Sequence, residues 1–254
     1  MPVSSINARS EELSLQQQRI ELVAAFRWTA RLNMHEAVAN HFSLSVNEDG
    51  TQFLMNPNQR HFSLIRASDL LLLDSNNDRT MHQENAPDPT AWFLHGALHR
   101  NCEHARCAMH VHSIHATALA CLEDSELQPI DQNTAMFYER YLIDHEFGGL
   151  AFQSEGERCS QMFSDPKKKV MIMGNHGVMV IGDSVADTFN RLFYFERAAE
   201  TYLKALWTGK KLRVLPEEVA RKTARQIDHY PGQGDRHFSD IMEILDRDEP
   251  DYRE

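Results

Sequence analysis

Hydrophobic and polar positions follow a helical period near the N-terminus of the chain and a strand period soon after it. Between residues 13 and 33, apolar side chains recur every three or four positions, which predicts an amphipathic helix. In the segment HFSLSV (41–46), apolar and polar residues alternate, as they do in a strand with one buried face. The turn sequence NEDG then leads into a second apolar run, TQFLMN, so we expect the two strands to form a hairpin.

The same two periods assign strands and helices to most of the remaining chain. Segment 168–183 predicts two strands joined by a tight turn between glycines, and the acidic tail, 246–254, is expected to fray. Hairpin-linked strands and helices follow one another without a regular strand–helix–strand repeat, which predicts an α+β domain layered around a mostly antiparallel sheet. The other expected elements are strands at 69–74 and 107–113 and helices at 90–100, 116–122, 184–208 and after Pro216.

Length, charge and cysteine content narrow the class of protein. The 254 residues suit one large domain or at most two small ones, and no apolar run is long enough to cross a membrane. The N-terminus lacks the apolar segment of a secretion signal, and the four cysteines form neither a CxxC pair nor a disulfide framework, so we expect a cytoplasmic protein. The net charge of −11 argues against nucleic acid or an anionic membrane surface as a partner.

Histidines are concentrated in one part of the sequence, where six of the 14 lie between His95 and His115. Side chains on a strand alternate between its faces, so His110 and His112 in CAMHVHSIH are expected to point the same way. Two imidazoles on one buried face need a partner for each nitrogen. A divalent metal ion would be such a partner, because it binds the neutral ring.

A third ligand is expected from a turn later in the chain. His176 lies between Gly174 and Gly177, where the backbone is predicted to turn tightly at the end of a strand. The alternative is that His110 and His112 are hydrogen-bonded core residues and His176 is an unrelated loop residue. An HxH strand followed by NHG at a strand junction favours the metal site.

The other histidines of this region are weaker candidates. His95 and His99 lie one helical turn apart, but Gly96 follows His95, so the HExxH motif of zinc proteases is absent. We expect both rings at the surface or behind the ligands. His115 begins a predicted helix and could line a pocket, and a ring that packs or faces solvent is an equal alternative.

Six short motifs follow one another along the chain: ANHFSLS (39–45), MNPNQ (55–59), SDLLLLD (68–74), LHGALHR (94–100), HVHS (110–113) and NHG (175–177). Each motif alone is weak, but HVHS and NHG at this separation are specific. In this order they resemble the class II aldolase and adducin family over roughly residues 15–230. The resemblance implies a single three-layer α/β/α sandwich around a largely antiparallel sheet, with extensions at 1–14 and 231–254. It also implies a homo-oligomer, usually a tetramer.

The resemblance implies a chemistry and the residues that carry it. Enzymes of the family hold a divalent ion through histidines, zinc in the aldolases and often manganese or magnesium in decarboxylating relatives. His110, His112 and His176 are therefore the implied ligands, and Zn²⁺ is the expected ion. The ion polarises a substrate oxygen and holds the enediolate that forms when a neighbouring bond breaks. Asn40 is the implied substrate-binding residue that this chain retains, and the substrate is a small molecule.

The chain departs from the family pattern where the aldolases move protons and hold phosphate. Ala91 stands in the place of a glutamate that binds the metal and acts as acid and base, and a methyl group does neither. In the phosphate pocket, the hairpin reads Pro57-Asn58 and the serine pair reads Pro89-Thr90. We therefore expect a substrate without a phosphate group.

The sequence leaves the residue that moves the proton unassigned. Gln132 aligns loosely with the tyrosine acid of the aldolases, Tyr138 lies nearby, and His115 is a further weak candidate for catalysis. Glu84 is the nearest carboxylate upstream of Ala91, and we expect it to be a solvated loop charge.

Two functions of different class remain. The first is a metal-dependent lyase, an aldolase or decarboxylase, that acts on a small oxygenated carbonyl or carboxylate compound. Decarboxylation ranks above sugar-phosphate cleavage, because loss of carbon dioxide needs no base to remove a C–H proton. The alternative is a non-catalytic adducin-like binding or structural protein, which Ala91 favours, whereas three converging imidazoles favour the enzyme. A cupin-type oxygenase would need an almost all-β sequence, which the long helices contradict.

Overall fold

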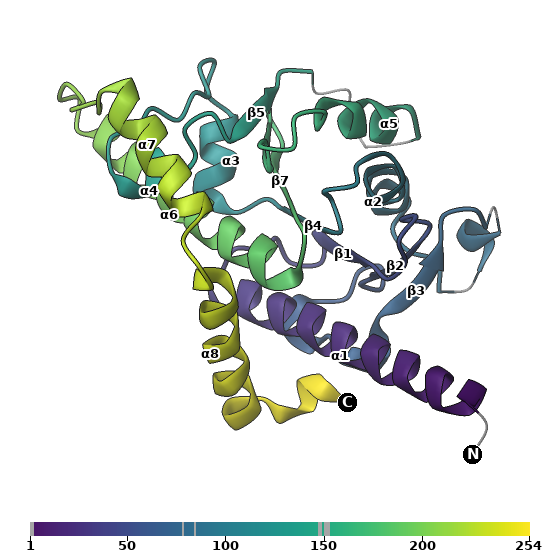
Figure 1. Cartoon of the computed structure of the whole chain (residues 1–254). Coiled ribbons are helices and arrows are strands. Elements are labelled where there is room, and N and C mark those ends of the chain that lie inside the picture. The colour runs from purple at the N-terminus through teal and green to yellow at the C-terminus, as the bar shows by residue number, and fades with distance from the viewer. Residues whose placement is uncertain (1–2, 78, 84, 147–148, 150–152) are drawn as a thin grey trace.

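The computed structural model describes residues 3–77, 79–83, 85–146, 149 and 153–254. Within them, seven strands form one sheet in the order β3-β2-β1-β4-β7-β6-β5 (Figure 1). Every neighbouring pair is antiparallel except β5 and β6, which are parallel. The strands are β1 His41–Ser45, β2 Gln52–Met55, β3 Leu71–Asp74, β4 Cys107–Val111, β5 Tyr141–Asp144, β6 Val170–Met173 and β7 Gly177–Gly182.

Helices cover both faces of this sheet. The apolar side chains of α2 and α5 pack on one face, and those of α1, α3 and α6 pack on the other. The predicted three-layer α/β/α sandwich around a largely antiparallel sheet is therefore confirmed. The helices are α1 Val3–Arg31, α2 Pro89–Asn101, α3 Ile114–Ala120, α4 Gln132–Met136, α5 Gln153–Met162, α6 Val185–Trp207, α7 Glu217–Asp228 and α8 Gln233–Asp248, with short 3-10 turns at Phe62–Leu64, Ala67–Asp69, Thr80–His82 and Pro250–Arg253.

The alternation of side chains along β4 decides which helix layer each of its residues meets. Met109 and Val111 pack with the α1 and α6 side of the core, whereas Ala108 packs with the α2 and α5 side. Because successive residues point to opposite faces, His110 lies on the face that α2 and α5 cover. None of the helices in this described part of the chain is long and apolar enough to cross a lipid bilayer.

The prediction that the strand at 41–46 buries only one face is wrong. Phe42 and Leu44 pack in the core as expected, but His41, Ser43 and Ser45 on the opposite face are buried as well. The helix α2 covers this second face and contacts β1. The polar residues at alternate positions predicted a solvent-exposed face. In the structure they lie in a buried polar layer whose groups hydrogen-bond to one another.

The prediction that the acidic tail frays is also wrong. The guanidinium of buried Arg27 in α1 donates to Glu249 at 3.1 Å and to Asp251 at 2.9 Å, and Tyr252 has no exposed surface. The helix α8 packs on α1 and α6, and the final turn packs on α1 (Figure 1). A buried arginine that meets two carboxylates from the end of the chain holds the tail in place.

The other predicted elements occur close to their expected positions. The strand predicted at 107–113 ends at Val111, and the long helix α6 begins after a Ser184 cap and is followed by Gly209, whose φ of +66° ends it. The pattern gave no signal for β5, α4, α5 or α8. The division of the chain at residues 14 and 230 stays a prediction.

Candidate metal centre

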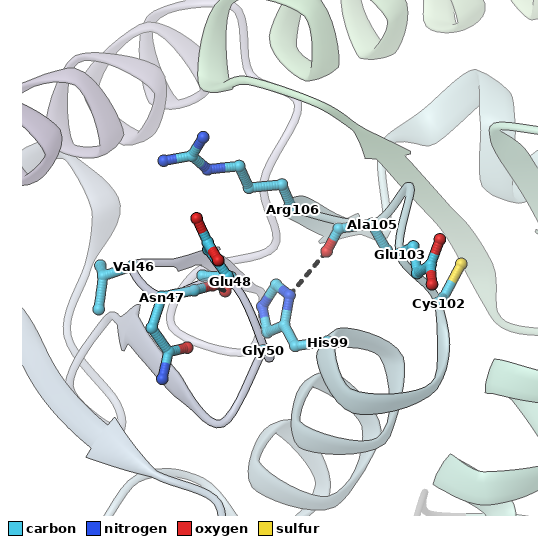
Figure 2. Close-up of a pocket in the computed structure, with 10 residues that line it drawn as sticks. Val46, Asn47, Glu48, Gly50, His99, Cys102, Glu103, Ala105 and Arg106 are labelled. Atoms are coloured by element: carbon cyan, nitrogen blue, oxygen red, sulfur yellow. Dashed lines mark hydrogen bonds between the residues drawn. The ribbon is translucent and has the colours of Figure 1, made fainter.

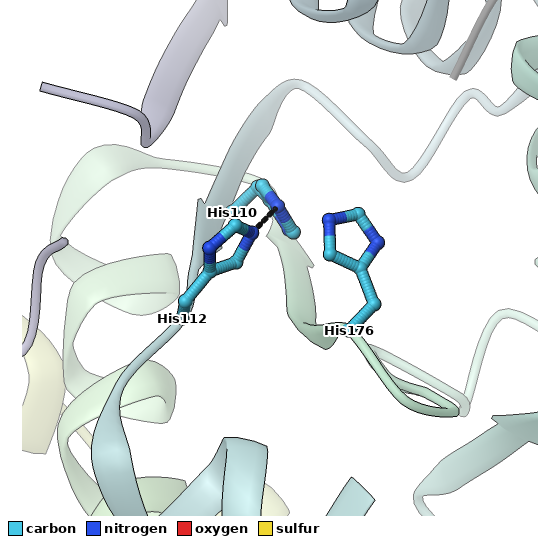
Figure 3. Close-up of side chains that lie close together, drawn as sticks. All are labelled: His110, His112 and His176. Atoms are coloured by element: carbon cyan, nitrogen blue, oxygen red, sulfur yellow. Dashed lines mark hydrogen bonds between the residues drawn. The ribbon is translucent and has the colours of Figure 1, made fainter. Parts of the chain in front are cut away.

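Three histidine rings meet at one end of the sheet (Figure 3). His110 is the penultimate residue of β4, His112 follows that strand, and His176 lies in the turn between β6 and β7. One ligand nitrogen of each ring lies within 4.8 Å of those of the others. The structure therefore brings together the three residues selected from the sequence, and their role as metal ligands stays a prediction.

The backbone of the β6–β7 turn brings His176 against the end of β4. Asn175 has a φ of +56°, and Gly177 begins the returning strand. A Cβ atom on Gly177 would lie 2.6 Å from the backbone oxygen of Val111 and 2.9 Å from the ring of His112. Only glycine permits this approach, because real Cβ atoms do not come so close to other heavy atoms.

The hydrogen bonds behind two of these rings fix where their protons lie. Nδ1 of His110 donates to the backbone oxygen of Val178 at 3.1 Å, and Nδ1 of His112 donates to the carboxylate of Glu36. In the neutral rings, both Nε2 atoms then carry lone pairs, and they face each other at 2.9 Å. Two lone pairs at this distance repel unless a cation lies between them, and a shared metal ion would remove the repulsion.

The charge state and the donor atoms also suit a metal ion. Burial lowers the pKa of His110 well below its usual value and lowers the pKa of His176 to about 4, so both rings are neutral at pH 7. Neutral imidazole is the form that binds metal. Three nitrogen donors fit zinc or a similar transition metal ion better than magnesium, which prefers oxygen.

Asn40 directly precedes β1 and lies beside the backbone of His112. Its Oδ1 accepts the backbone N–H of Glu36 at 2.6 Å and that of His112 at 3.5 Å. Its Nδ2 is buried and has no hydrogen-bond partner among the described residues. A buried amide donor without a partner is costly, and the role of Asn40 in substrate binding stays a prediction.

A buried carboxylate that the sequence analysis missed anchors the segment after His112. Glu196 of α6 accepts the hydroxyl of Ser113 at 2.6 Å and the backbone N–H of Ala116 at 2.9 Å. It also accepts the backbone N–H of His115 at 3.0 Å and Nδ1 of its ring at 2.8 Å. His115 is therefore held by this carboxylate. An acidic residue on the apolar face of a long helix was the available signal.

The other candidates for catalysis lie elsewhere in the described structure. Gln132 begins α4, which packs against α6 and α7, and the ring of Tyr138 lies 5.5 Å from the guanidinium carbon of Arg221 in α7. Neither belongs to the three-histidine group. Glu84 lies outside the described residues.

Ala91 lies in an apolar environment. It sits in the first turn of α2, where the Asp88 carboxylate caps the helix and accepts its N–H at 3.1 Å. Its methyl group is buried with Phe53, Leu73 and Trp92. The position at which the family resemblance implies an acid is therefore occupied by a buried methyl group in an apolar cluster.

A second group of potential metal ligands is already paired with an arginine side chain; its members are Asp144, Glu155 and Cys159. The guanidinium of Arg158 donates to Asp144 at 2.5 and 2.9 Å and to Glu155 at 2.5 Å. Burial raises the pKa of Cys159 to about 12, so its thiol stays protonated. This group is explained as an ion pair that packs α5 against the end of β5.

His95 and His99 are not at the surface, contrary to one of the two expectations for them. Both are buried in α2 on the face that meets β1, and neither belongs to the three-histidine group. His95 hydrogen-bonds to His41 at 2.7 Å, and the ring of His41 lies 4.8 Å from that of His110 between centroids. His95 reaches the three histidines only through His41, and the expectation that the two rings lie behind metal ligands stays a prediction.

The far end of this polar layer opens into a small surface pocket (Figure 2). Its volume is about 290 Å³, and Glu48, His99, Glu103 and Arg106 contribute charged or polar groups to its wall. The ring of His99 donates to the backbone oxygen of Ala105 at 2.7 Å, so its Nδ1 is engaged in the wall. The pocket holds none of the three converging histidines.

Known proteins share this fold and much of this sequence. The profile of the class II aldolase and adducin N-terminal domain matches residues 20–203. A Pseudomonas aeruginosa protein named as an aldolase class 2 protein is 28% identical over 244 residues, which cover 94% of this chain and 92% of the relative. The crystal structure of an aldolase II superfamily protein from Pseudomonas syringae has a TM-score of 0.83 at 29% identity, covering 94% of this chain and 96% of that chain.

The chain therefore belongs to the class II aldolase and adducin family. Among its relatives, the decarboxylase NovR of Streptomyces niveus is 24% identical over 205 residues, which cover 80% of this chain and 74% of the relative. The family thus includes relatives named for aldol chemistry and for decarboxylation.

Proposed function

We propose that this protein is a divalent-metal-dependent carbon–carbon lyase that acts on a small, oxygenated, non-phosphorylated carboxylate or carbonyl compound. The observation that carries the proposal is the pair of Nε2 lone pairs on His110 and His112, which face each other at 2.9 Å with His176 beside them. A divalent ion held there would supply Lewis-acid stabilisation of negative charge that develops on substrate oxygens. Zinc is the expected ion, and manganese or magnesium are the alternatives.

The protein side chains would then bind and orient the substrate. Asn40 would donate its Nδ2–H₂, which has no partner among the described residues, to a substrate oxygen. Glu36 holds the ring of His112 through Nδ1, and the Val178 carbonyl holds that of His110. These partners keep both Nε2 atoms directed at the same point.

Decarboxylation fits this set of residues better than aldol cleavage of a sugar phosphate. Aldol cleavage needs a base to take a hydroxyl proton and an acid to return one, and Ala91 supplies neither. In decarboxylation, the bond from the α-carbon to the carboxylate breaks, its electron pair moves toward the adjacent carbonyl oxygen, and carbon dioxide leaves. Only the return of one proton to carbon is then needed, and solvent can supply it. The relative named as a decarboxylase supports this ranking.

The experiment is a comparison of substrates on the metal-loaded protein. We expect release of carbon dioxide from one or more members of a panel of 3-keto acids, in which a carbonyl lies next to the α-carbon, and cleavage of four- to six-carbon ketose 1-phosphates at least about a hundredfold slower. Aldol cleavage of a ketose 1-phosphate at about 1–10 s⁻¹ would overturn the ranking. Metal binding without turnover of either class would favour the non-catalytic, adducin-like alternative.

The proposal extends to assembly and location. We propose a homotetramer, which the family resemblance supports, so light scattering should give about four times the 29.3 kDa chain mass, and a monomer at micromolar concentration would contradict it. A cytoplasmic location is supported by the four cysteines, all described and all free.

A further inference from the structure

A chain of hydrogen bonds runs through the polar layer between β1 and α2. Nδ1 of His99 donates to the backbone oxygen of Ala105 at 2.7 Å, and Nε2 of the same ring lies 2.6 Å from Oγ of Ser43. Oγ of Ser43 in turn bonds to Nδ1 of His95. Nε2 of His95 lies 2.7 Å from Nδ1 of His41. All four side chains belong to residues that are more than nine-tenths buried.

The chain of hydrogen bonds ends at a carbonyl oxygen, which fixes the direction of every bond in it. The oxygen of Ala105 can only accept, so His99 carries its proton on Nδ1 and, when neutral, accepts the Ser43 hydroxyl proton at Nε2. Ser43 has no second proton, so it accepts from Nδ1 of His95. Nε2 of His95 is then an acceptor, and Nδ1 of His41 must donate to it. Nε2 of His41 is left with a lone pair.

Burial keeps the rings of this chain in their neutral forms. Removal from water lowers the pKa of His99 to about 4, and it lowers the pKa of His95 well below its usual value. The assignment of protons therefore follows from the geometry with one proton on each ring.

The ring of His41 lies beside the three-histidine site. The strand register pairs His41 with His110, whose ring centroid is 4.8 Å away. His41 is not one of the residues whose ligand atoms form the three-histidine group. Its Nε2 has no hydrogen-bond partner among the described residues. The fully buried polar atoms without a partner do not include this nitrogen, so it keeps some accessible surface. The neighbouring residue, Asn40, has a buried amide donor without a partner among the described residues, so this end of β1 carries one acceptor and one donor.

We propose that His41 is a specificity-determining residue that accepts a hydrogen bond from a substrate hydroxyl group. The chain of hydrogen bonds that ends at the Ala105 oxygen keeps the proton of His41 on Nδ1 and so leaves Nε2 as the acceptor. The inference rests on the proposed function, because the three histidines locate the substrate. It narrows the substrate class to compounds with a hydroxyl group next to the carboxylate and carbonyl groups, such as 2-hydroxy-3-keto acids.

The proton positions can be measured directly and without metal. In protein labelled with ¹⁵N-histidine, long-range ¹H–¹⁵N correlation spectra should show His41, His95 and His99 protonated on Nδ1, whereas free histidine in water favours Nε2. The variant Ser43→Ala should convert His41 to a mixture of both forms. The matched control is Ser45→Ala on the same face of β1, whose hydroxyl bonds to Asn47 instead and whose loss should change no ring. A proton on Nε2 of His41 in the wild-type protein would overturn the proposal.

The ligand preference is tested by calorimetry on the zinc-loaded protein. Glycolate carries a hydroxyl donor, and methoxyacetate presents the same oxygens without it. We expect wild-type protein to prefer glycolate by about fivefold to tenfold, and His41→Phe, which keeps a ring but lacks the acceptor, to reduce this preference below about twofold. The same preference for glycolate in wild type and His41→Phe, both with normal zinc content, would overturn this inference and leave the proposed function standing. A wild-type protein that takes up no zinc would overturn the proposed function and this ligand assignment with it, while the ring protonation would still be as described.

Discussion

Glu196 should be among the most sensitive positions for both stability and metal binding. Its two oxygens accept four hydrogen bonds from the segment 113–116, which directly follows His112. In Glu196→Gln one oxygen becomes an amino group. Whichever way the amide turns, a backbone N–H of His115 or Ala116 then faces another N–H donor.

The expected cost follows from these contacts. An unsatisfied buried donor costs about 1–3 kcal/mol, and the loss of the negative charge weakens the remaining bonds by about 1 kcal/mol more. We therefore expect Glu196→Gln to lower the free energy of unfolding by about 2–4 kcal/mol. For a chain of this size, that corresponds to a decrease in Tm of about 5–12 °C. Zinc affinity should fall as well, because His112 loses its anchored neighbour.

Urea and thermal unfolding measure this effect, with Glu200→Gln as the control one turn further along α6. Glu200 pairs with the exposed side chains of Arg197 and Lys204, so its loss should change the free energy of unfolding by less than about 0.5 kcal/mol. A Tm of Glu196→Gln within about 1 °C of wild type would refute the structural role assigned to this carboxylate.

Three further predictions concern pH, the tail and the turn. The free energy of unfolding of the metal-free protein should fall as the pH is lowered from 6.5 to 4, because His99 (pKa about 4) and His41 (pKa about 3) bind protons in the unfolded chain but stay neutral in the folded protein. Urea unfolding at several pH values should show this decrease, and an equally steep decrease in His99→Gln would contradict it. Tyr252→Ala should lower the free energy of unfolding by about 3–4 kcal/mol, whereas a frayed tail would give less than about 0.5 kcal/mol. Gly177→Ala should weaken zinc binding in calorimetry, because its Cβ would lie 2.6 Å from the Val111 oxygen, and an unchanged affinity would contradict that constraint.

The sequence predicted those features whose signals are local. HVHS and NHG each lie within a few residues, and the alternation of a strand and the glycines of a turn sufficed to select His110, His112 and His176. The layered fold followed from the same periods together with the family resemblance. Both kinds of signal survive in a single chain, because strand alternation and turn chemistry depend on neighbours in sequence.

Features that depend on distant partners could not be predicted in this way. The burial of Arg27 depends on carboxylates more than 200 positions later in the chain, and that of Glu196 depends on donors 80 positions earlier. Ser43 looked solvent-facing because a buried hydroxyl is tolerated only when a partner such as His95 or His99 meets it, and that meeting is a property of the tertiary fold.

The central claim is that His110, His112 and His176 hold one divalent ion per chain. Protein loaded with zinc and dialysed at pH 7 should contain about one zinc per chain by elemental analysis, and His176→Ala should retain less than about one tenth of it while keeping its helical content. The control is His229→Ala, which replaces an exposed histidine directly after α7 and should keep the full zinc content. Full zinc retention in His176→Ala would contradict the account.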